Sequence, residues 1–312
     1  MNNKKIRLYI SLIAGIMVLT ISGCKNNKKD IAKDKGQENI VTVDSIDRQL
    51  VEDVKSVKEM FYAMPSPLEV AMILKQSNSP YNQEVLNPVK NTSRYVTTKS
   101  MALNLGIYTT DLSYSSLYDQ TQTTIDYINA AKEMADGLGI LNAIDKETVQ
   151  RLEANVNNRD VILDIISETI MNSNSFFKEN DQKAISTIVL IGGWIEGLYI
   201  ATKLVEGNPS QQEINNNELI NRIVDQKLAL NTIESLVEEE KDNEHLASVN
   251  AQIKELKDVY DQIKINSSKV IPVKDSTTNV TTLKSQTSIS MTPEIYKQLK
   301  EKIHVVRNKF TS

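Results

Sequence analysis

Two acidic residues inside apolar stretches are the positions where this sequence could support chemistry. Asp111 and Glu196 each interrupt a strongly apolar helical pattern. A carboxyl group in such a setting can act as a general acid or base without a histidine. Residues three or four positions apart share one face of a helix. The two polar faces defined in this way are Asn104, Tyr108, Asp111 and Tyr118 on one helix, and Gly192, Glu196, Tyr199 and Lys203 on the other.

These faces lead to two hypotheses. If they meet, a ligand pocket with two acids forms, lined by Tyr108, Asp111, Glu196 and Tyr199. An envelope hydrolase that uses paired carboxylates would need a pocket of this kind. The alternative is that each acid pairs with a Lys, Arg or Tyr and sets the register of its helix. The sequence favours this structural alternative, because buried polar groups are usually hydrogen-bonded and perturbed acids are not always functional.

Other catalytic residue types are scarce. The chain has two histidines, His245 and His304, and neither has a nucleophile or carboxylate partner at a spacing typical of a catalytic triad. We expect both to be solvated, His245 at the tip of a hairpin and His304 on the polar side of the last helix. Two histidines also exclude a catalytic zinc site built on several His ligands, and no Walker lysine motif or Gly-rich dinucleotide turn occurs. We therefore predict no cofactor, no metal and no catalytic residue, and we do not predict an enzyme.

The only cysteine, Cys24, stands at the end of a typical secretory signal. Lys4, Lys5 and Arg7 form a basic start, an apolar run of about 12 residues follows, and small residues precede Cys24. An uncleaved membrane helix is disfavoured, because a span needs roughly 20 apolar residues. An ordinary signal peptide with a coincidental cysteine remains the other alternative. A single cysteine excludes an intramolecular disulfide and a Cys-ligated zinc.

The four residues Ile21-Ser22-Gly23-Cys24 resemble the lipobox of bacterial lipoproteins. The resemblance implies that residues 1–23 are removed as a signal peptide and that Cys24 becomes the first residue of the mature protein. In that family the cysteine carries a diacylglyceryl thioether and its new amine is usually acylated. We therefore expect the protein to be anchored by lipid in the bacterial cell envelope, in the outer membrane. The sequence does not indicate which leaflet of that membrane carries the protein.

Residues 24–43 have the composition of a lipidated flexible tether. They are rich in Lys, Asn and Asp and poor in large apolar groups, so they cannot bury enough surface to offset the entropy of ordering. Lys25, Lys28 and Lys29 would lie beside anionic head groups, where each cation contributes on the order of 1 kcal/mol. The formal net charge of −4 and the absence of a Lys/Arg cluster beyond this tether argue against a nucleic-acid partner.

Helical patterns dominate from Asp44 onward, and residues 44–209 are expected to form a helical bundle domain. Pro65 should end the first helix, and Ser66 and Pro67 can start the next one. Residues 78–90 form an irregular connection. Asp145 and Asp160 are candidate N-caps. The expected helices cover residues 44–63, 66–77, 97–119, 122–138, 145–156, 160–177 and 185–201.

Residues 185–201 form the most apolar stretch of the mature chain. The Gly193-to-Gly197 spacing matches the close-approach pattern of membrane helices. The stretch is nevertheless short for a span, and it contains the carboxylate of Glu196. We therefore predict a core helix whose glycines let a neighbouring backbone approach closely.

Residues 210–265 carry the clearest periodicity and predict an antiparallel helical hairpin packed on the bundle. Two stripes of apolar residues step by four and three, with a short gap at 241–243. Gln226 interrupts the first stripe and can help fix the register. Residues 266–291 are rich in Ser and Thr and predict an irregular or short extended segment. Thr292-Pro293-Glu294 then starts a C-terminal helix over 292–312, whose apolar stripe should pack back on the body.

The fold class is thus all-α, a multi-helix bundle with a long C-terminal antiparallel hairpin and one Ser/Thr-rich irregular segment. The stretch from Tyr62 to Tyr118, which includes Asn87-Pro88-Val89 and Arg94-Tyr95, is similar to uncharacterised helical lipoproteins of the Bacteroidota. That resemblance implies an address and a fold but no activity. We expect a membrane-anchored lipoprotein whose helical domain binds an envelope protein or glycan. The alternatives are the hydrolase with paired carboxylates and a structural assembly protein that acts through its hairpin.

Overall fold

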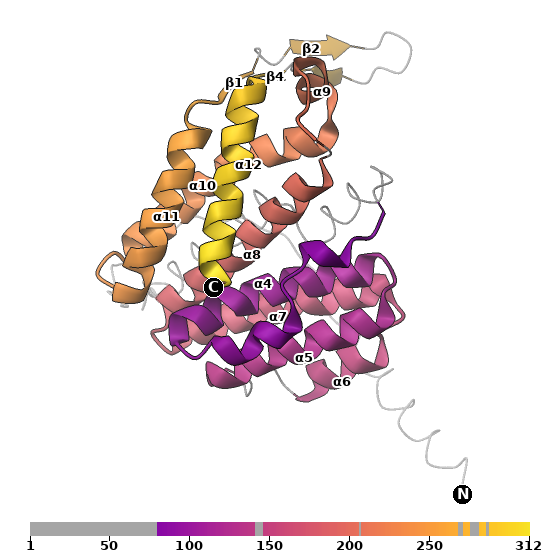
Figure 1. The fold of residues 1–312 in the computed structure, drawn as a ribbon, viewed down its shortest axis with the longest axis vertical. Coiled ribbons are helices and arrows are strands. Elements are labelled where there is room, and N and C mark those ends of the chain that lie inside the picture. Colours follow the sequence, from indigo (N-terminus) through magenta and orange to yellow (C-terminus); the bar gives the residue numbers. More distant parts are fainter. Residues whose placement is uncertain (1–79, 141–145, 206, 268–270, 275–280, 285–286) are drawn as a thin grey trace, which may run out of the picture. The chain divides into compact units, whose positions relative to one another are not determined.

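The computed structural model describes residues 80–140, 146–205, 207–267, 271–274, 281–284 and 287–312 (Figure 1). All of them lie in the larger of two compact units of the chain, Gln49–Ser312. Several predictions lie outside the described residues: the predicted signal peptide, Cys24, the predicted tether, the helices expected before residue 78 and the candidate cap Asp145.

The described part of the chain is all-α, as predicted, with a few short strands. The α-helices are α4 Thr98–Leu117, α5 Thr121–Gly137, α6 Lys146–Ala154, α7 Arg159–Glu179, α8 Lys183–Leu204, α9 Gln211–Asn216, α10 Glu218–Glu239, α11 Glu244–Tyr260 and α12 Pro293–Phe310. Two 3-10 helices, η1 Gln83–Val85 and η2 Val89–Arg94, form the connection before α4. The strands are β1 Lys264–Ser267, β2 Ile271–Lys274, β3 Thr281–Lys284 and β4 Thr287–Ser290.

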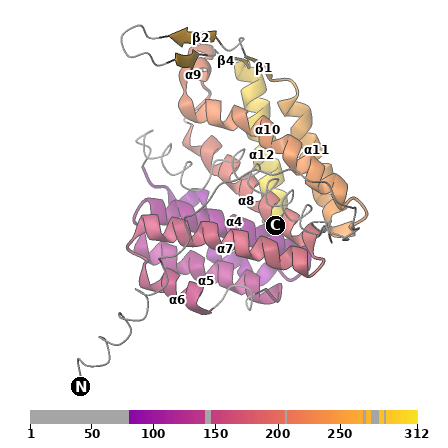
Figure 2. The same cartoon turned by 180° about the vertical axis from the view of Figure 1, so that it is seen from behind.

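Helices α4 and α8 form the centre of the described fold. Helix α5 and helix α7 pack against α4, and α7, α10 and α12 pack against α8 (Figures 1 and 2). Glycines make the contact between α4 and α8 unusually close. A Cβ atom on Gly106 of α4 would overlap the carbonyl of Val189, and one on Gly192 of α8 would overlap the carbonyl of Leu103. The two backbones can approach this closely only because neither position carries a side chain.

Helix α8 is the one described helix that is long and apolar enough to cross a membrane, but 67 % of its apolar window is buried inside the protein. This burial agrees with the core-helix prediction. The glycine prediction is only partly right. Gly192 and Gly193 face α4, whereas a Cβ on Gly197 would meet no atom within 4 Å, so the Gly193-to-Gly197 pair is not the contact surface.

Helix starts follow local capping chemistry. At the start of α4, the Thr97 side chain accepts a hydrogen bond from the backbone N–H of Ser100 in a capping box. At the start of α12, Thr292 precedes Pro293 and its side chain accepts from the backbone N–H of Ile295, which confirms the predicted helix start. The prediction of Asp160 as a cap is wrong. Asn158 accepts from the N–H of Val161, and Asp160 lies in the first turn of α7. The short helix α9 was not predicted, although it also begins with a Ser-x-x-Glu capping box.

The predicted hairpin is present as α10 and α11, and its apolar stripes are buried. Tyr260 of α11 donates to the carbonyl of Ile223 in α10, and Gln226 accepts from Trp194 of α8, which fixes the hairpin on the core. After the hairpin, β1 pairs with β4 and β2 pairs with β3, both antiparallel. The Ser/Thr-rich segment therefore contains short extended pairs, and α12 packs back against α8 and α11 as expected.

The glycine contact gives a matched test of the fold. We expect Gly106→Ala and Gly192→Ala each to lower the free energy of unfolding by roughly 1 to 3 kcal/mol, because the new methyl group must displace backbone. Gly197→Ala, at a position with open space, should instead raise stability by up to about 1 kcal/mol through helix propensity. Urea unfolding of the three variants measures the difference. Equal effects at all three positions would show that the contact is not sterically limiting.

Candidate functional site

The sequence left open whether Asp111 and Glu196 meet, and in the structure the two acids lie together with Arg307 of α12. The Nε and Nη2 atoms of Arg307 donate to the two carboxylate oxygens of Glu196, at 2.9 and 3.0 Å. Asp111 lies within hydrogen-bonding reach of Glu196. Asp111 and Glu196 are 0 % exposed and Arg307 is 7 % exposed. The three side chains, here called the acid cluster, therefore join α4, α8 and α12 inside the protein.

Burial shifts the pKa of both acids in the acid cluster upward. Burial, and then the charge of Glu196, raise the pKa of Asp111 well above its usual range, although Arg307 and the N–H of Asn87 oppose this shift. Burial also raises the pKa of Glu196, and the bidentate Arg307 opposes it. The Oδ1 atom of Asp111 is buried and receives no hydrogen bond from a donor in the described part of the chain. A neutral Asp111 that donates to an ionised Glu196 satisfies this geometry.

A network of amides and tyrosines surrounds the acid cluster. The backbone N–H of Asn87 donates to Asp111 at 3.0 Å, and the Asn87 side chain donates to Asn104 and to Tyr95. Asn104 and Tyr95 in turn donate to the carbonyls of Phe310 and Thr311, at the end of α12. The connection before α4, α4 itself and the C-terminus are thus tied together by buried hydrogen bonds.

The four predicted pocket residues are neighbours, but they are packed side chains. Tyr108 is 0 % exposed and donates to the carbonyl of Pro88. Tyr199 is 8 % exposed, and Arg307 lies over its ring at 4.5 Å from the centroid. With Asp111 and Glu196 also buried, solvent does not reach the two acids. The geometry matches the structural alternative, in which Glu196 pairs with an Arg.

His304 was expected to be solvated, and this expectation is wrong. Its ring is half-buried and packs edge-on against Tyr199, with 4.8 Å between centroids. Its Nε2 lies 3.1 Å from the Thr202 hydroxyl, which donates to the carbonyl of Tyr199. The ring nitrogen and the hydroxyl are therefore in hydrogen-bonding contact. Burial, and the charges of Lys203, Lys300 and Arg307, lower the pKa of His304 from 6.5 to about 4.

Sequence reasoning missed Arg307 and Asn87 as members of this site. Arg307 follows Ile303 by four residues, so it lies on the apolar face of α12, and a cation in that position was the available indication. Asn87 precedes Pro88 in a connection with no periodicity, and no pattern predicted its contacts. Among the residues that the structure describes, no group of three or more His, Cys, Asp or Glu side chains could hold a metal ion.

Comparisons with known proteins add no relative: no protein-family model, no curated protein and no solved structure matches this chain.

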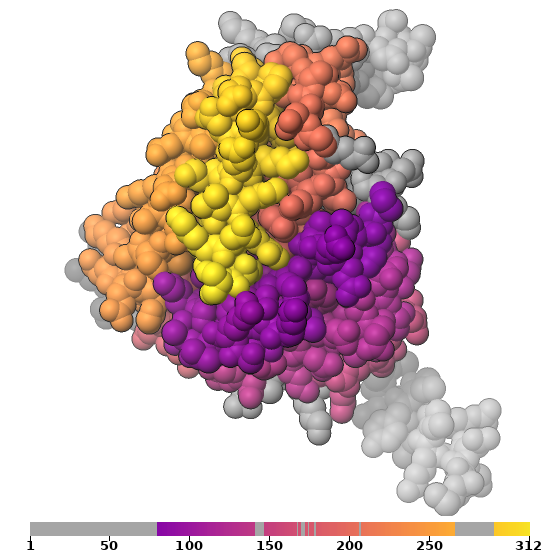
Figure 3. All heavy atoms as spheres, in the orientation of Figure 1, coloured from indigo at the N-terminus to yellow at the C-terminus, as the bar shows by residue number. Residues whose placement is uncertain are grey.

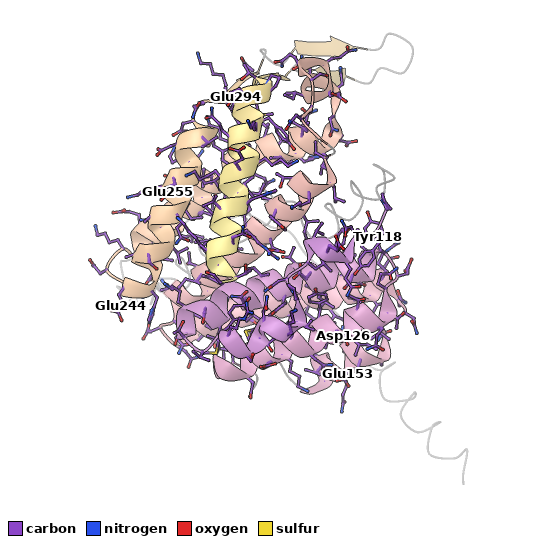
Figure 4. All side chains as sticks on the ribbon, in the orientation of Figure 1. Tyr118, Asp126, Glu153, Glu244, Glu255 and Glu294 are labelled. Carbon is purple, nitrogen blue, oxygen red and sulfur yellow. The ribbon has the colours of Figure 1, made fainter. Side chains whose placement is uncertain are left out.

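The acid cluster predicts that removing the cation of a buried ion pair lowers the free energy of unfolding far more than removing the cation of an exposed one. We expect Arg307→Met to lower the free energy of unfolding by about 3 to 5 kcal/mol, because it leaves the buried Glu196 without a cation. Lys309→Met is the matched control. Lys309 lies on the same helix and pairs at 3.8 Å with Glu255 of α11, which Figure 4 labels, and both side chains are exposed. The Lys309→Met substitution should therefore cost no more than about 1 kcal/mol.

A double variant makes this comparison specific to the ion pair. Glu196→Gln in the Arg307→Met background should recover part of the loss, because the amide carries no buried charge. Chemical unfolding of the single and double variants measures the coupling. Additive effects of the two substitutions would contradict the assignment of Arg307 as the partner of Glu196.

The half-buried His304 predicts a pH dependence of stability. The unfolded chain binds a proton below pH 6.5 and the folded protein only near pH 4, so stability falls as the pH drops from 6.5 towards 4. The slope is at most about 1.4 kcal/mol per pH unit, reduced by solvent because the ring is half-buried. His304→Gln should flatten this slope between pH 6.5 and 5 in chemical unfolding. A flattened slope in the matched variant His245→Gln, with the slope of His304→Gln unchanged, would contradict the assignment.

Proposed function

We propose that this chain is a lipid-anchored protein of the bacterial cell envelope whose helical body binds an envelope partner. The anchor rests on the lipobox resemblance of Ile21-Ser22-Gly23-Cys24 behind a basic and apolar start. Binding in preference to catalysis rests on one observation. The carboxylate of Glu196, one of two acids that could do chemistry, is already paired with Arg307 by two hydrogen bonds.

The hydrolase alternative lacks both the separation of the two acids and the access that it needs. Paired-carboxylate hydrolysis needs two acids on either side of a substrate bond. Asp111 and Glu196 contact each other instead, and both are 0 % exposed. Arg307 of α12 also occupies both carboxylate oxygens of Glu196. The same contacts that unite the acids therefore favour a structural role for them.

The assembly alternative needs apolar surface on the hairpin. The apolar stripes of α10 and α11 are buried within this chain, and among the large apolar side chains described on these helices only Leu228 is clearly exposed, at 61 %. One exposed leucine is ordinary on a protein surface. The hairpin stripes thus support the body of this chain, and the proposed partner is another envelope molecule, a protein or a glycan.

The anchor is tested by lipid labelling. Cys24→Ser removes the sulfur that would carry the diacylglyceryl group, so we expect radiolabelled fatty acid incorporation to be lost and an unprocessed precursor to accumulate. Ser22→Ala, which leaves a small residue two positions before Cys24, is the matched control and should keep both labelling and processing. Unchanged labelling of Cys24→Ser would overturn the anchor.

Partner binding is tested in the same strains. A photo-crosslinking residue is placed at the exposed positions Val96, Leu228 and Val305, and at the exposed polar position Glu153 of α6 as a control (Figure 4). In intact envelopes we expect one defined species at one of the apolar positions, absent at Glu153 and lost with Cys24→Ser. The same pattern at all four positions would mean random collision and would count against a binding domain.

A further inference from the structure

The connection before α4 carries apolar and cationic side chains on its outward side. Six exposed residues form what we call the η2 surface: Pro88, Val89, Lys90, Ser93, Arg94 and Val96. Val96 is 77 % exposed and Val89 is 37 % exposed. Figure 3 shows this connection, coloured indigo, as part of the molecular surface beside the end of α12. Two of the four exposed large apolar side chains in the described part of the chain thus lie on one short segment.

Buried hydrogen bonds hold the inward side of the same segment. The Asn91 side chain donates to the Asn87 side chain at 2.9 Å, and the Tyr95 hydroxyl donates to the carbonyl of Thr311 at 3.2 Å. Asn91 and Tyr95 are both buried, so the side chains of the η2 surface are presented outward on a backbone that is already fixed. A surface that is ordered in advance loses less conformational entropy when it binds.

This stretch of the chain is positively charged. Residues 85–110 contain Lys90, Arg94 and Lys99, and they contain no Asp or Glu. The Nζ atom of Lys99 donates to the Ser248 hydroxyl of α11 at 3.1 Å, whereas Lys90 and Arg94 are exposed on the η2 surface. One exposed valine directly precedes Lys90, and the other follows Arg94 by two positions. The η2 surface therefore combines exposed apolar groups with cations.

This combination fits a lipid surface better than a protein partner. A specific protein interface has about 20 to 30 residues on each side, with complementary shape. The η2 surface supplies six residues on one short connection. A membrane interface accepts separate apolar side chains at the boundary between head groups and acyl chains, and anionic head groups attract Lys and Arg side chains beside them. The chemistry of the η2 surface thus matches an anionic phospholipid membrane.

We propose that the η2 surface docks on an anionic phospholipid membrane, with Val89 and Val96 at the head-group boundary and Lys90 and Arg94 beside the lipid phosphates. The proposal rests on the envelope location of the proposed function, and it adds a second membrane contact to the lipid anchor. An anchored body is held close to the bilayer, so a contact that is weak by itself is sufficient to dock it. Docking turns the connection before α4 towards the membrane.

Tryptophan reporters test the docking. The full processed chain is purified in detergent and reconstituted into vesicles that contain brominated phosphatidylcholine, which quenches tryptophan on contact. Val96→Trp places a reporter on the η2 surface, and Leu228→Trp, at an exposed apolar position of α10, is the matched control. The one native tryptophan, Trp194, is 3 % exposed and gives a constant background. We expect quenching of Val96→Trp that rises to a plateau with the content of phosphatidylglycerol, and no such rise for Leu228→Trp.

The cations of the η2 surface are tested in the Val96→Trp chain. Lys90→Gln and Arg94→Gln should each lower the ratio of docked to undocked protein roughly fivefold, because a cation beside an anionic membrane contributes on the order of 1 kcal/mol. The matched charge controls are Lys132→Gln on α5 and Lys254→Gln on α11, both at exposed positions, and they should dock like the parent. Added salt should weaken docking, because it screens the attraction. Thermal unfolding confirms that each variant is folded.

Several outcomes overturn the proposal: no added quenching of Val96→Trp with phosphatidylglycerol, equal quenching of Leu228→Trp, or an effect of Lys132→Gln as large as that of Arg94→Gln. Crosslinking of position 96 to a protein without lipid quenching also overturns it, and assigns the surface to a protein partner. Flotation with pure phosphatidylcholine vesicles reports the lipid anchor separately. A chain that does not float is titrated with the same brominated vesicles, so docking is measured whether or not the anchor is present.

Discussion

A carboxylate inside an apolar core is stable only when a cation and hydrogen bonds replace its water, and much of this structure follows from that constraint at Glu196. The cation is Arg307, which belongs to the last helix. Helix α12 must therefore lie against α8 for the core to be free of an unpaired charge. The second acid, Asp111, accepts a hydrogen bond from the backbone N–H of Asn87, and burial raises the pKa of its carboxyl group. The burial of one charge thus links the connection before α4, the two central helices and the C-terminus.

The close contact between α4 and α8 makes this arrangement possible. Gly106 and Gly192 let the two backbones touch, which brings Asp111 and Glu196 within reach of each other. Larger residues at these positions would separate the helices and leave space around two acids. The polar interior is consequently specific and closed. A closed polar core of this kind favours a function carried by the surface of the protein.

Different parts of the sequence were informative to different degrees. Helices with a periodic apolar face, such as α10, α11 and α12, were predicted with useful bounds, because periodicity reports which side must be buried. The start of α7 was placed on Asp160 in place of Asn158, since both residue types cap helices and local sequence does not choose between neighbours. Helical projection places His304 next to charged residues, which predicts a solvated ring. Burial depends on the facing helix, and Tyr199 and Thr202 of α8 cover the ring.

By itself the sequence determined the all-α class, the hairpin, the packing of the last helix on the body and the two acids that could converge. These features follow from local periodicity and from residue types that are costly to bury. Only the tertiary structure decided that Asp111 and Glu196 share one cluster and that Arg307 completes it. Such pairings join residues about 100 positions apart, and their geometry depends on which helix faces which. That choice is set by the fit of whole surfaces, of which the glycine contact between α4 and α8 is the closest.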